Sequence, residues 1–166
     1  MLLNNLAPTI EGYFWKRKSL YFDKKDNLKT TFLSGLLSKV KLKIAKYDRR
    51  YFKLDIQDFV FSYAKDPASL ATPNYCTSLR NLVSVKRNIV TMPEEDEEGN
   101  IQYKEMNILE TTHEIDRGPN EACQNVFELK VADRMFTLYT TDNIMMEKFV
   151  LYFEKIIELK MQVLHV

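Results

Sequence analysis

Short runs that alternate apolar and polar residues, separated by turn signals, make up most of this sequence. "NVFELKVAD" and "RMFTLYTTD" both alternate and meet at "ADR", which predicts a β-hairpin. "TIEGYFWKRKSLYF", "YDRRYFKLD" and "DFVFSYAKD" are also rich in the aromatic and β-branched residues that favour strands. The sequence therefore predicts a mainly β fold.

The segment after this hairpin has helical rather than alternating periodicity. Thr141 or Asp142 can cap its first turn. One face of the helix would then carry five apolar residues: Met145, Phe149, Tyr152, Phe153 and Ile156. We expect a helix over about 143–162 that closes the core of a sheet of short antiparallel strands.

The middle of the chain is less regular. Residues 28–38 have near-helical spacing and residues 40–44 alternate, which indicates a helix followed by a strand. "SLRNLVSVKRNIV" predicts one or two strands, and "IQYKEMNIL" predicts another. Between these two stretches, the acidic residues of "MPEEDEEGN" predict a solvated loop at about 92–100.

Charge is distributed unevenly along the chain, although the formal net charge is +1. Residues 16–53 contain thirteen Lys or Arg and three Asp, a net charge of +10, which leaves −9 for the rest. Such a basic region predicts attraction to polyanions such as anionic lipid head groups or nucleic acid. The alternative is a solvated, lysine-rich insertion without a partner.

Length and composition predict one domain over residues 1–166, and we expect a monomer. Cys76 and Cys123 have no metal-ligand spacing, which favours a reducing compartment. No apolar run is long enough to span a bilayer, and "MLLNNLAPTI" does not resemble a signal peptide. We therefore expect a cytoplasmic protein.

The sequence offers no arrangement typical of an active site. His113 and His165 are isolated from other metal ligands and nucleophiles. The glycines of "GNIQ" and "GPNE" form no phosphate-binding motif. We expect neither an enzyme nor a cofactor or metal site.

Seven phrases, in order, resemble the strands and helix of the pleckstrin-homology (PH) domain family. They are "EGYFWK", "RRYFKL", "FVFSYAKDPAS", "SLRNLVSV" (fourth and fifth strands), "NVFELKV", "RMFTLYTTD" and "MMEKFVLYFEKII" (helix). The resemblance implies a seven-stranded, bent antiparallel barrel closed by a C-terminal helix. It also implies a long insertion, about 19–46, between strands 1 and 2.

The resemblance also implies binding of anionic phospholipid head groups, such as phosphoinositides or phosphatidic acid, by a peripheral membrane module. The matching head-group residues are Lys16, Arg49 and Arg50, with Lys18 and Lys53 as neighbours. Alternate strand side chains face opposite ways, so Arg49 and Arg50 cannot both line one pocket. The family pattern implies that Lys16 and Arg50 form its centre.

A second set of residues is expected to contact the membrane surface, with apolar side chains entering the leaflet and cations holding its anionic surface. The set is Trp15, Arg17, Phe32, Leu36, Lys39, Lys41 and Lys43. The alternative for its insertion residues is packing on the barrel exterior.

Three features depart from the family pattern: the long insertion, Phe149 where the helix tryptophan is expected, and Asp48 where lipid binders tend to have a cation. Asp48 favours the main alternative function, a PH-type protein interaction scaffold without tight lipid binding. Nucleic acid is a weaker alternative, because the chain outside residues 16–53 is acidic.

Overall fold

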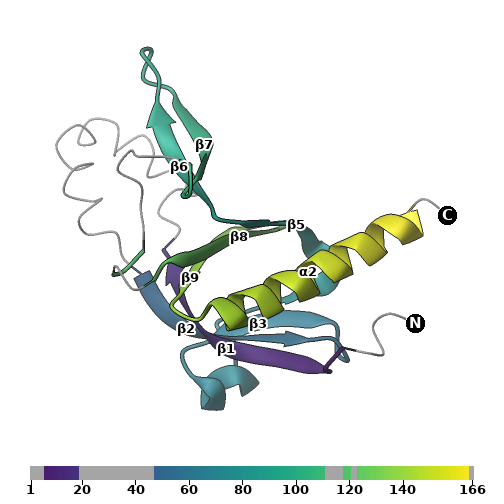
Figure 1. Ribbon diagram of the computed structural model, residues 1–166. Coiled ribbons are helices and arrows are strands. Elements are labelled where there is room, and N and C mark those ends of the chain that lie inside the picture. The colour runs from purple at the N-terminus through teal and green to yellow at the C-terminus, as the bar shows by residue number, and fades with distance from the viewer. Residues whose placement is uncertain (1–5, 19–46, 111–117, 121–122, 165–166) are drawn as a thin grey trace.

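A computed structural model describes residues 6–18, 47–110, 118–120 and 123–164 (Figure 1). Seven antiparallel strands form one sheet in the order β4-β3-β2-β1-β9-β8-β5. Their bounds are β1 Thr9–Arg17, β2 Tyr47–Asp55, β3 Val60–Ala64, β4 Tyr75–Ser78, β5 Leu82–Arg87, β8 Asn125–Val131 and β9 Met135–Thr140. Helix α2, Asn143–Leu164, follows β9. The mainly β fold with a closing helix is confirmed.

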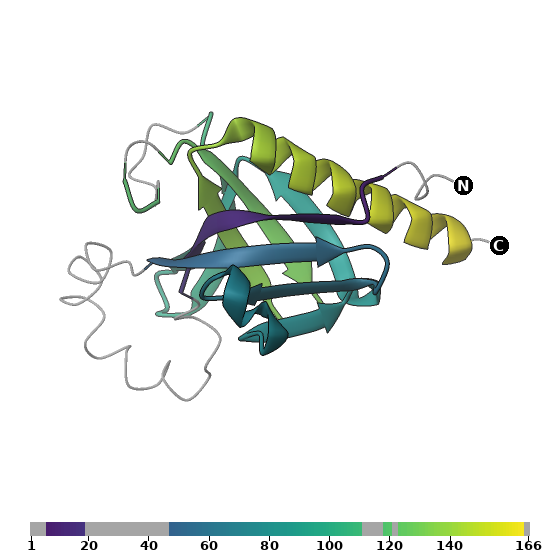
Figure 2. The same cartoon turned by 90° about the horizontal axis from the view of Figure 1, so that it is seen from below.

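The sheet bends into two layers (Figure 2). β1 to β4 form one layer, β5, β8 and β9 form the other, and α2 lies along the edge of the resulting barrel (Figure 2). Asp142 caps the helix, because its Oδ1 accepts a hydrogen bond from the Met145 N–H at 3.0 Å. This capping residue is one of the two expected from the sequence.

Aromatic side chains dominate the core between the two layers and the helix. Phe149 of α2 is 1% exposed, and its ring centroid lies 5.0 Å from that of Phe14 in β1. Phe14 also makes edge contacts with Phe52 and Phe127. Phe149 thus packs the helix against β1, as expected from its place on the predicted apolar face, and Phe14 in turn contacts Phe127 of the other layer.

Strands β6, Ile89–Glu95, and β7, Ile101–Asn107, form a separate two-stranded hairpin. The hairpin follows β5 in the chain and projects away from the barrel (Figure 1). Its base rests on a second apolar cluster whose buried members are Val90, Cys123, Val126 and Tyr139. The seven-stranded sheet and this hairpin are therefore separate structural parts.

Two predictions about the middle of the chain are wrong in detail. The acidic segment is not a loop over 92–100, because β6 extends to Glu95 and leaves a turn over 96–100. The fourth strand is Tyr75–Ser78, whereas Leu79–Asn81 form a 3-10 helix. Pairing of β6 with β7 outweighs the low strand preference of acidic residues.

A second 3-10 helix, Pro67–Ala71, lies in the β3–β4 connection, where Asp66 caps it. Strand β1 ends at Arg17, which is shorter than the predicted run. The predicted helix over 28–38 and strand over 40–44 lie outside the described residues.

Candidate functional site

Lys16, Lys18 and Arg50 gather where β1 ends and β2 begins. In the antiparallel register, Lys16 is opposite Asp48 and Phe14 is opposite Arg50. Opposed side chains share a face of the sheet, and every second residue of a strand returns to that face. Because Phe14 is buried in the core, Lys16 and Arg50 lie on the inner face of the sheet.

Asp48 lies between two of these cations. Its Oδ1 is 3.5 Å from the Lys18 Nζ, and its Oδ2 is 3.5 Å from the Arg50 Nη2. Arg50 also donates through Nη1 to its neighbour's backbone oxygen, the carbonyl of Arg49, at 3.0 Å. Asp48 therefore neutralises part of the local positive charge through two long ion pairs.

Burial lowers the pKa of the Lys16 ammonium, and the nearby charges of Arg50, Arg134 and Lys18 lower this pKa further. Asp48 acts in the opposite direction. We call Lys16, Lys18, Asp48, Arg50 and Arg134 the basic cluster. It combines four cations with one carboxylate, so an added anion would find net positive charge.

Aromatic rings extend the basic cluster across the sheet. The Lys16 Nζ lies 5.6 Å from the ring centroid of Tyr63, which stacks on Tyr75. The guanidinium of Arg134 lies 4.6 Å from the ring centroid of Tyr75, whose hydroxyl donates to Asp133 at 3.0 Å. The rings and the β8–β9 turn thus bring Arg134 near residues that are far from it in sequence.

Tyr63, Tyr75 and Arg134 were not among the residues predicted for the site. The sequence marked Arg134 as a turn residue of "ADR", but its approach to Lys16 depends on the bend of the sheet. Tyr63 could have been found from the alternation of β3, which places it on the inner face opposite Phe52.

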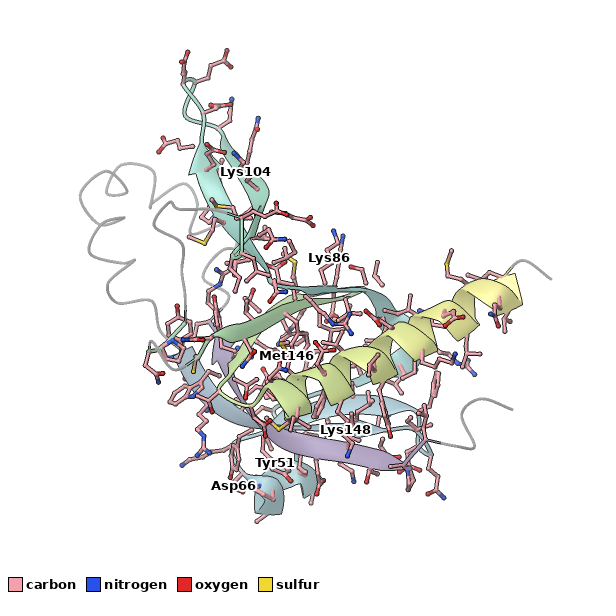
Figure 3. All side chains as sticks on the ribbon, in the orientation of Figure 1. Tyr51, Asp66, Lys86, Lys104, Met146 and Lys148 are labelled. Carbon is pink, nitrogen blue, oxygen red and sulfur yellow. The ribbon has the colours of Figure 1, made fainter. Side chains whose placement is uncertain are left out.

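Arg49 and Lys53 lie on the other face of β2. The guanidinium of Arg49 is 3.9 Å from the ring centroid of Tyr13, and Lys53 pairs with Asp55 at 3.6 Å. Tyr13 packs edge-on against Tyr51, which Figure 3 labels on this part of the sheet. The five predicted head-group residues therefore divide between two faces.

Arg17 and Trp15, both predicted to contact a membrane, lie close to the hairpin base. Arg17 donates through Nη2 to the Thr91 carbonyl oxygen at 2.7 Å and through Nη1 to the Met92 Sδ at 3.4 Å. Trp15 is half-buried against the second apolar cluster. The other predicted membrane contacts lie outside the described residues: Phe32, Leu36, Lys39, Lys41 and Lys43.

Within the described ranges, no three His, Cys, Asp or Glu side chains are grouped so that they could hold a metal ion. No helix within these ranges has the length and apolar character needed to cross a bilayer.

The fold of this chain is similar to that of known protein structures. No family model and no curated protein matches the sequence. The solution structure of the PH domain of human oxysterol-binding protein-related protein 11 is 11% identical, with a TM-score of 0.50. The alignment covers 93% of this chain and 84% of that one.

The solution structure of the PH domain of the human KIAA0053 protein is 17% identical, with a TM-score of 0.48. That alignment covers 93% of this chain and 92% of the other. The strand order, the closing helix and the likeness to the oxysterol-binding protein-related structure together show that this chain has the pleckstrin-homology fold.

Proposed function

We propose that this PH-fold module binds anionic phospholipid head groups through the basic cluster and associates peripherally with a cytoplasmic membrane surface. The observation that carries the proposal is the convergence of Lys16, Lys18 and Arg50 on one face of two adjacent strands. A phosphate at this face would meet cations from β1 and β2 at once.

The two cation types contribute differently to such a site. The Arg50 guanidinium can present two parallel N–H donors to phosphate oxygens, which fixes orientation, whereas a lysine ammonium supplies a mobile point charge. The lowered pKa of Lys16 reflects a charge that is poorly solvated in the free protein. An anion beside it would replace that lost solvation and favour the protonated amine.

Arg134 adds a fourth cation from the β8–β9 turn. The Arg134 side chain is exposed, and its positive charge lowers the pKa of Lys16. We propose that Arg134 contacts a second phosphate or the glycerol-linked phosphate of the same lipid. Phosphoinositides and phosphatidic acid both carry the phosphate oxygens that this cluster would recognise.

A PH-type protein interaction scaffold without tight lipid binding is the second candidate. Asp48 favours it, because its two oxygens already pair with Lys18 and Arg50. An incoming phosphate would have to displace Asp48 or tolerate its repulsion. Both 3.5 Å ion pairs are partly exposed, and exposed pairs contribute about 0–1 kcal/mol, so displacement is energetically modest.

Co-sedimentation with three vesicle types tests the proposal: neutral phosphatidylcholine alone, with phosphatidic acid, and with a phosphoinositide. We expect binding to the anionic vesicles that weakens steeply with salt, because exposed charges are screened over about 8 Å at physiological ionic strength. A soluble inositol phosphate should displace the protein if the basic cluster forms a pocket. Equal binding to neutral and anionic vesicles would refute the proposal and favour the scaffold.

A further inference from the structure

The basic cluster contains two kinds of cation. Two of its cations, Lys18 and Arg50, share the carboxylate of Asp48 through ion pairs of 3.5 Å. The other two, Lys16 and Arg134, form no ion pair with any carboxylate in the described ranges. The protein therefore neutralises the charges of this second pair less than those of the first.

Tyrosine rings, rather than carboxylates, hold Lys16 and Arg134. The Lys16 Nζ lies 5.6 Å from the ring centroid of Tyr63, and the guanidinium carbon of Arg134 lies 4.6 Å from the ring centroid of Tyr75. A cation over an aromatic face is attracted by the ring quadrupole, and its N–H donors are not consumed as they are in an ion pair. The rings thus position both cations and leave their donors to a phosphate.

The two tyrosine rings form one packed unit. Tyr63 and Tyr75 are opposite each other in the register of β3 and β4, and their rings stack with centroids 5.8 Å apart and an interplanar angle of 23°. Phe136 of the core makes edge contacts with both rings, at centroid distances of 5.9 and 5.3 Å. Side chains that are already fixed by packing lose little conformational freedom when a ligand binds. The stack therefore holds the two cations at a set separation before the ligand arrives.

Arg134 reaches this stack from the β8–β9 turn. Its backbone forms the closing hydrogen-bonded pair of that hairpin with Val131, which is 1% exposed, so the Arg134 side chain shares the inner face with Val131. The Tyr75 hydroxyl donates to the Asp133 Oδ1 at 3.0 Å and ties the same turn to β4. A ligand on the inner face would thus meet Lys16 from one layer of the barrel and Arg134 from the other.

We propose that the stacked Tyr63 and Tyr75 are positioning residues of the head-group site, which hold Lys16 and Arg134 as two separate phosphate contacts. The site then binds a head group that carries two phosphates more tightly than a head group that carries one. This inference rests on the proposed function, because it names the ligand class of the same site. The chemistry recognised is a ring with two phosphate groups, which a lipid or a soluble inositol phosphate can supply.

Two vesicle types of equal surface charge test the ligand class. One contains phosphatidic acid in phosphatidylcholine, and the other contains a phosphatidylinositol bisphosphate in phosphatidylcholine. We expect binding to the bisphosphate vesicles to be about tenfold tighter, because the second phosphate adds a charge-assisted hydrogen bond at Arg134. Calorimetric titration with a soluble inositol bisphosphate and a soluble inositol monophosphate repeats the comparison without a membrane and should give the same order of affinity.

The outcomes separate this inference from the proposed function. Equal binding to the two anionic vesicle types would overturn the inference and leave binding of anionic head groups intact. A preference that appears on vesicles but not with the soluble phosphates would also overturn it, because the bilayer rather than the site would then supply the preference. A lack of binding to both anionic vesicle types would refute the inference and the proposed function together.

Arg134→Ala and Lys130→Ala form a matched pair of variants. Both remove one exposed positive charge, but Lys130 follows the buried Leu129 and lies on the outer face of β8. General attraction to an anionic surface falls in both variants and on both vesicle types. We expect Arg134→Ala to abolish the preference for bisphosphate vesicles and Lys130→Ala to keep it. The same preference in both variants would overturn the role of Arg134.

Two substitutions of Tyr75 test the ring itself. Tyr75→Leu removes the ring that lies against Arg134, whereas Tyr75→Phe keeps it and loses only the hydrogen bond to Asp133. We expect Tyr75→Leu to weaken binding to bisphosphate vesicles about two- to fivefold, the range for a cation over an exposed ring, with phosphatidic acid binding unchanged and Tyr75→Phe close to the unaltered protein. Equal losses for both lipids, or for both variants, would contradict a positioning role. If Tyr75→Leu does not fold, the comparison of Arg134→Ala with Lys130→Ala decides.

Discussion

The basic cluster and the β6–β7 hairpin differ in charge and in construction, yet adjacent residues of β1 serve both. Lys16 points to the inner face beside Asp48, whereas Arg17 points outward and bonds to Thr91 of the hairpin. The alternation of one strand thus divides a single basic run between two regions. A net charge of +1 conceals a cationic site and an anionic hairpin in one molecule.

The two regions also differ in the size of the apolar cluster against which they pack. The basic cluster is built on strands whose inner face is the large aromatic core, including Phe14 and Phe52. The hairpin packs through its own Val90 against three other buried residues, Cys123, Val126 and Tyr139, and is held by the Thr91 bonds to Glu128 and Arg17. We therefore expect amides of the barrel to exchange only when the whole protein unfolds. Amides of the hairpin should exchange through a local opening of lower free energy.

The largest expected effect is on the barrel. Phe149→Ala should lower the free energy of unfolding by about 3–5 kcal/mol, because Phe149 is 1% exposed and contacts Phe14. Urea unfolding measures this loss. Val126→Ala, in the second cluster, is the comparison and should mainly speed amide exchange in the hairpin. An unchanged midpoint for Phe149→Ala would contradict its role in anchoring the helix.

Next in size is the effect of the inner-face lysine on vesicle binding. Lys16→Ala should weaken binding to anionic vesicles by about 1.5–3 kcal/mol, the range for a hydrogen bond to a charged group. Lys53→Ala is the matched control, because Lys53 lies on the outer face and pairs with Asp55. It should remove about 1 kcal/mol of general surface attraction. Equal losses for the two variants would indicate a diffuse basic surface.

Asp48 supplies a prediction of opposite sign. Asp48→Asn removes the carboxylate between Lys18 and Arg50 and should strengthen vesicle binding by about 1 kcal/mol or less. A protein scaffold that uses the same ion pairs predicts no gain. Vesicle titration of Asp48→Asn against the unaltered chain separates the two functions.

The smallest effect concerns pH and the hairpin base. Burial raises the pKa of the Glu128 carboxyl, while the hydrogen bonds from Thr91 and the charge of Arg17 oppose this rise and Glu105 adds to it. Because the pKa of Glu128 is higher in the folded state, its protonation contributes to the free energy of unfolding at pH values below the unfolded-state pKa. It is lost as the pH rises through the folded pKa.

Glu128→Gln should therefore flatten the pH dependence of the unfolding free energy just above the ordinary carboxyl range. Urea unfolding of both proteins across that range measures the difference. Parallel pH profiles would show that Glu128 does not titrate differently in the folded state.

Strand and helix periodicity predicted the short antiparallel strands and the closing helix, and strand alternation predicted that Arg49 and Arg50 face opposite ways. The barrel and the choice of Lys16 with Arg50 came from the resemblance to the PH family. The last part of β6 was missed, because pairing with β7 overrides the low strand preference of "PEE". Arg134, which lies over the ring of Tyr75, joins the basic cluster through the bend of the sheet, which no local pattern encodes. Arg17 looked like another surface cation, and its bond to Thr91 depends on where the hairpin docks.

The most direct test of the basic cluster compares two neighbouring arginines. Arg50 lies on the inner face near Asp48 and Lys16, whereas Arg49 lies on the outer face over Tyr13, so alanine at either position removes the same charge. We expect Arg50→Ala to weaken phosphoinositide-vesicle binding about tenfold or more, and the affinity of Arg49→Ala to stay within about threefold of that of the unaltered protein. Equal losses, or a larger loss for Arg49→Ala, would contradict a head-group site on the inner face.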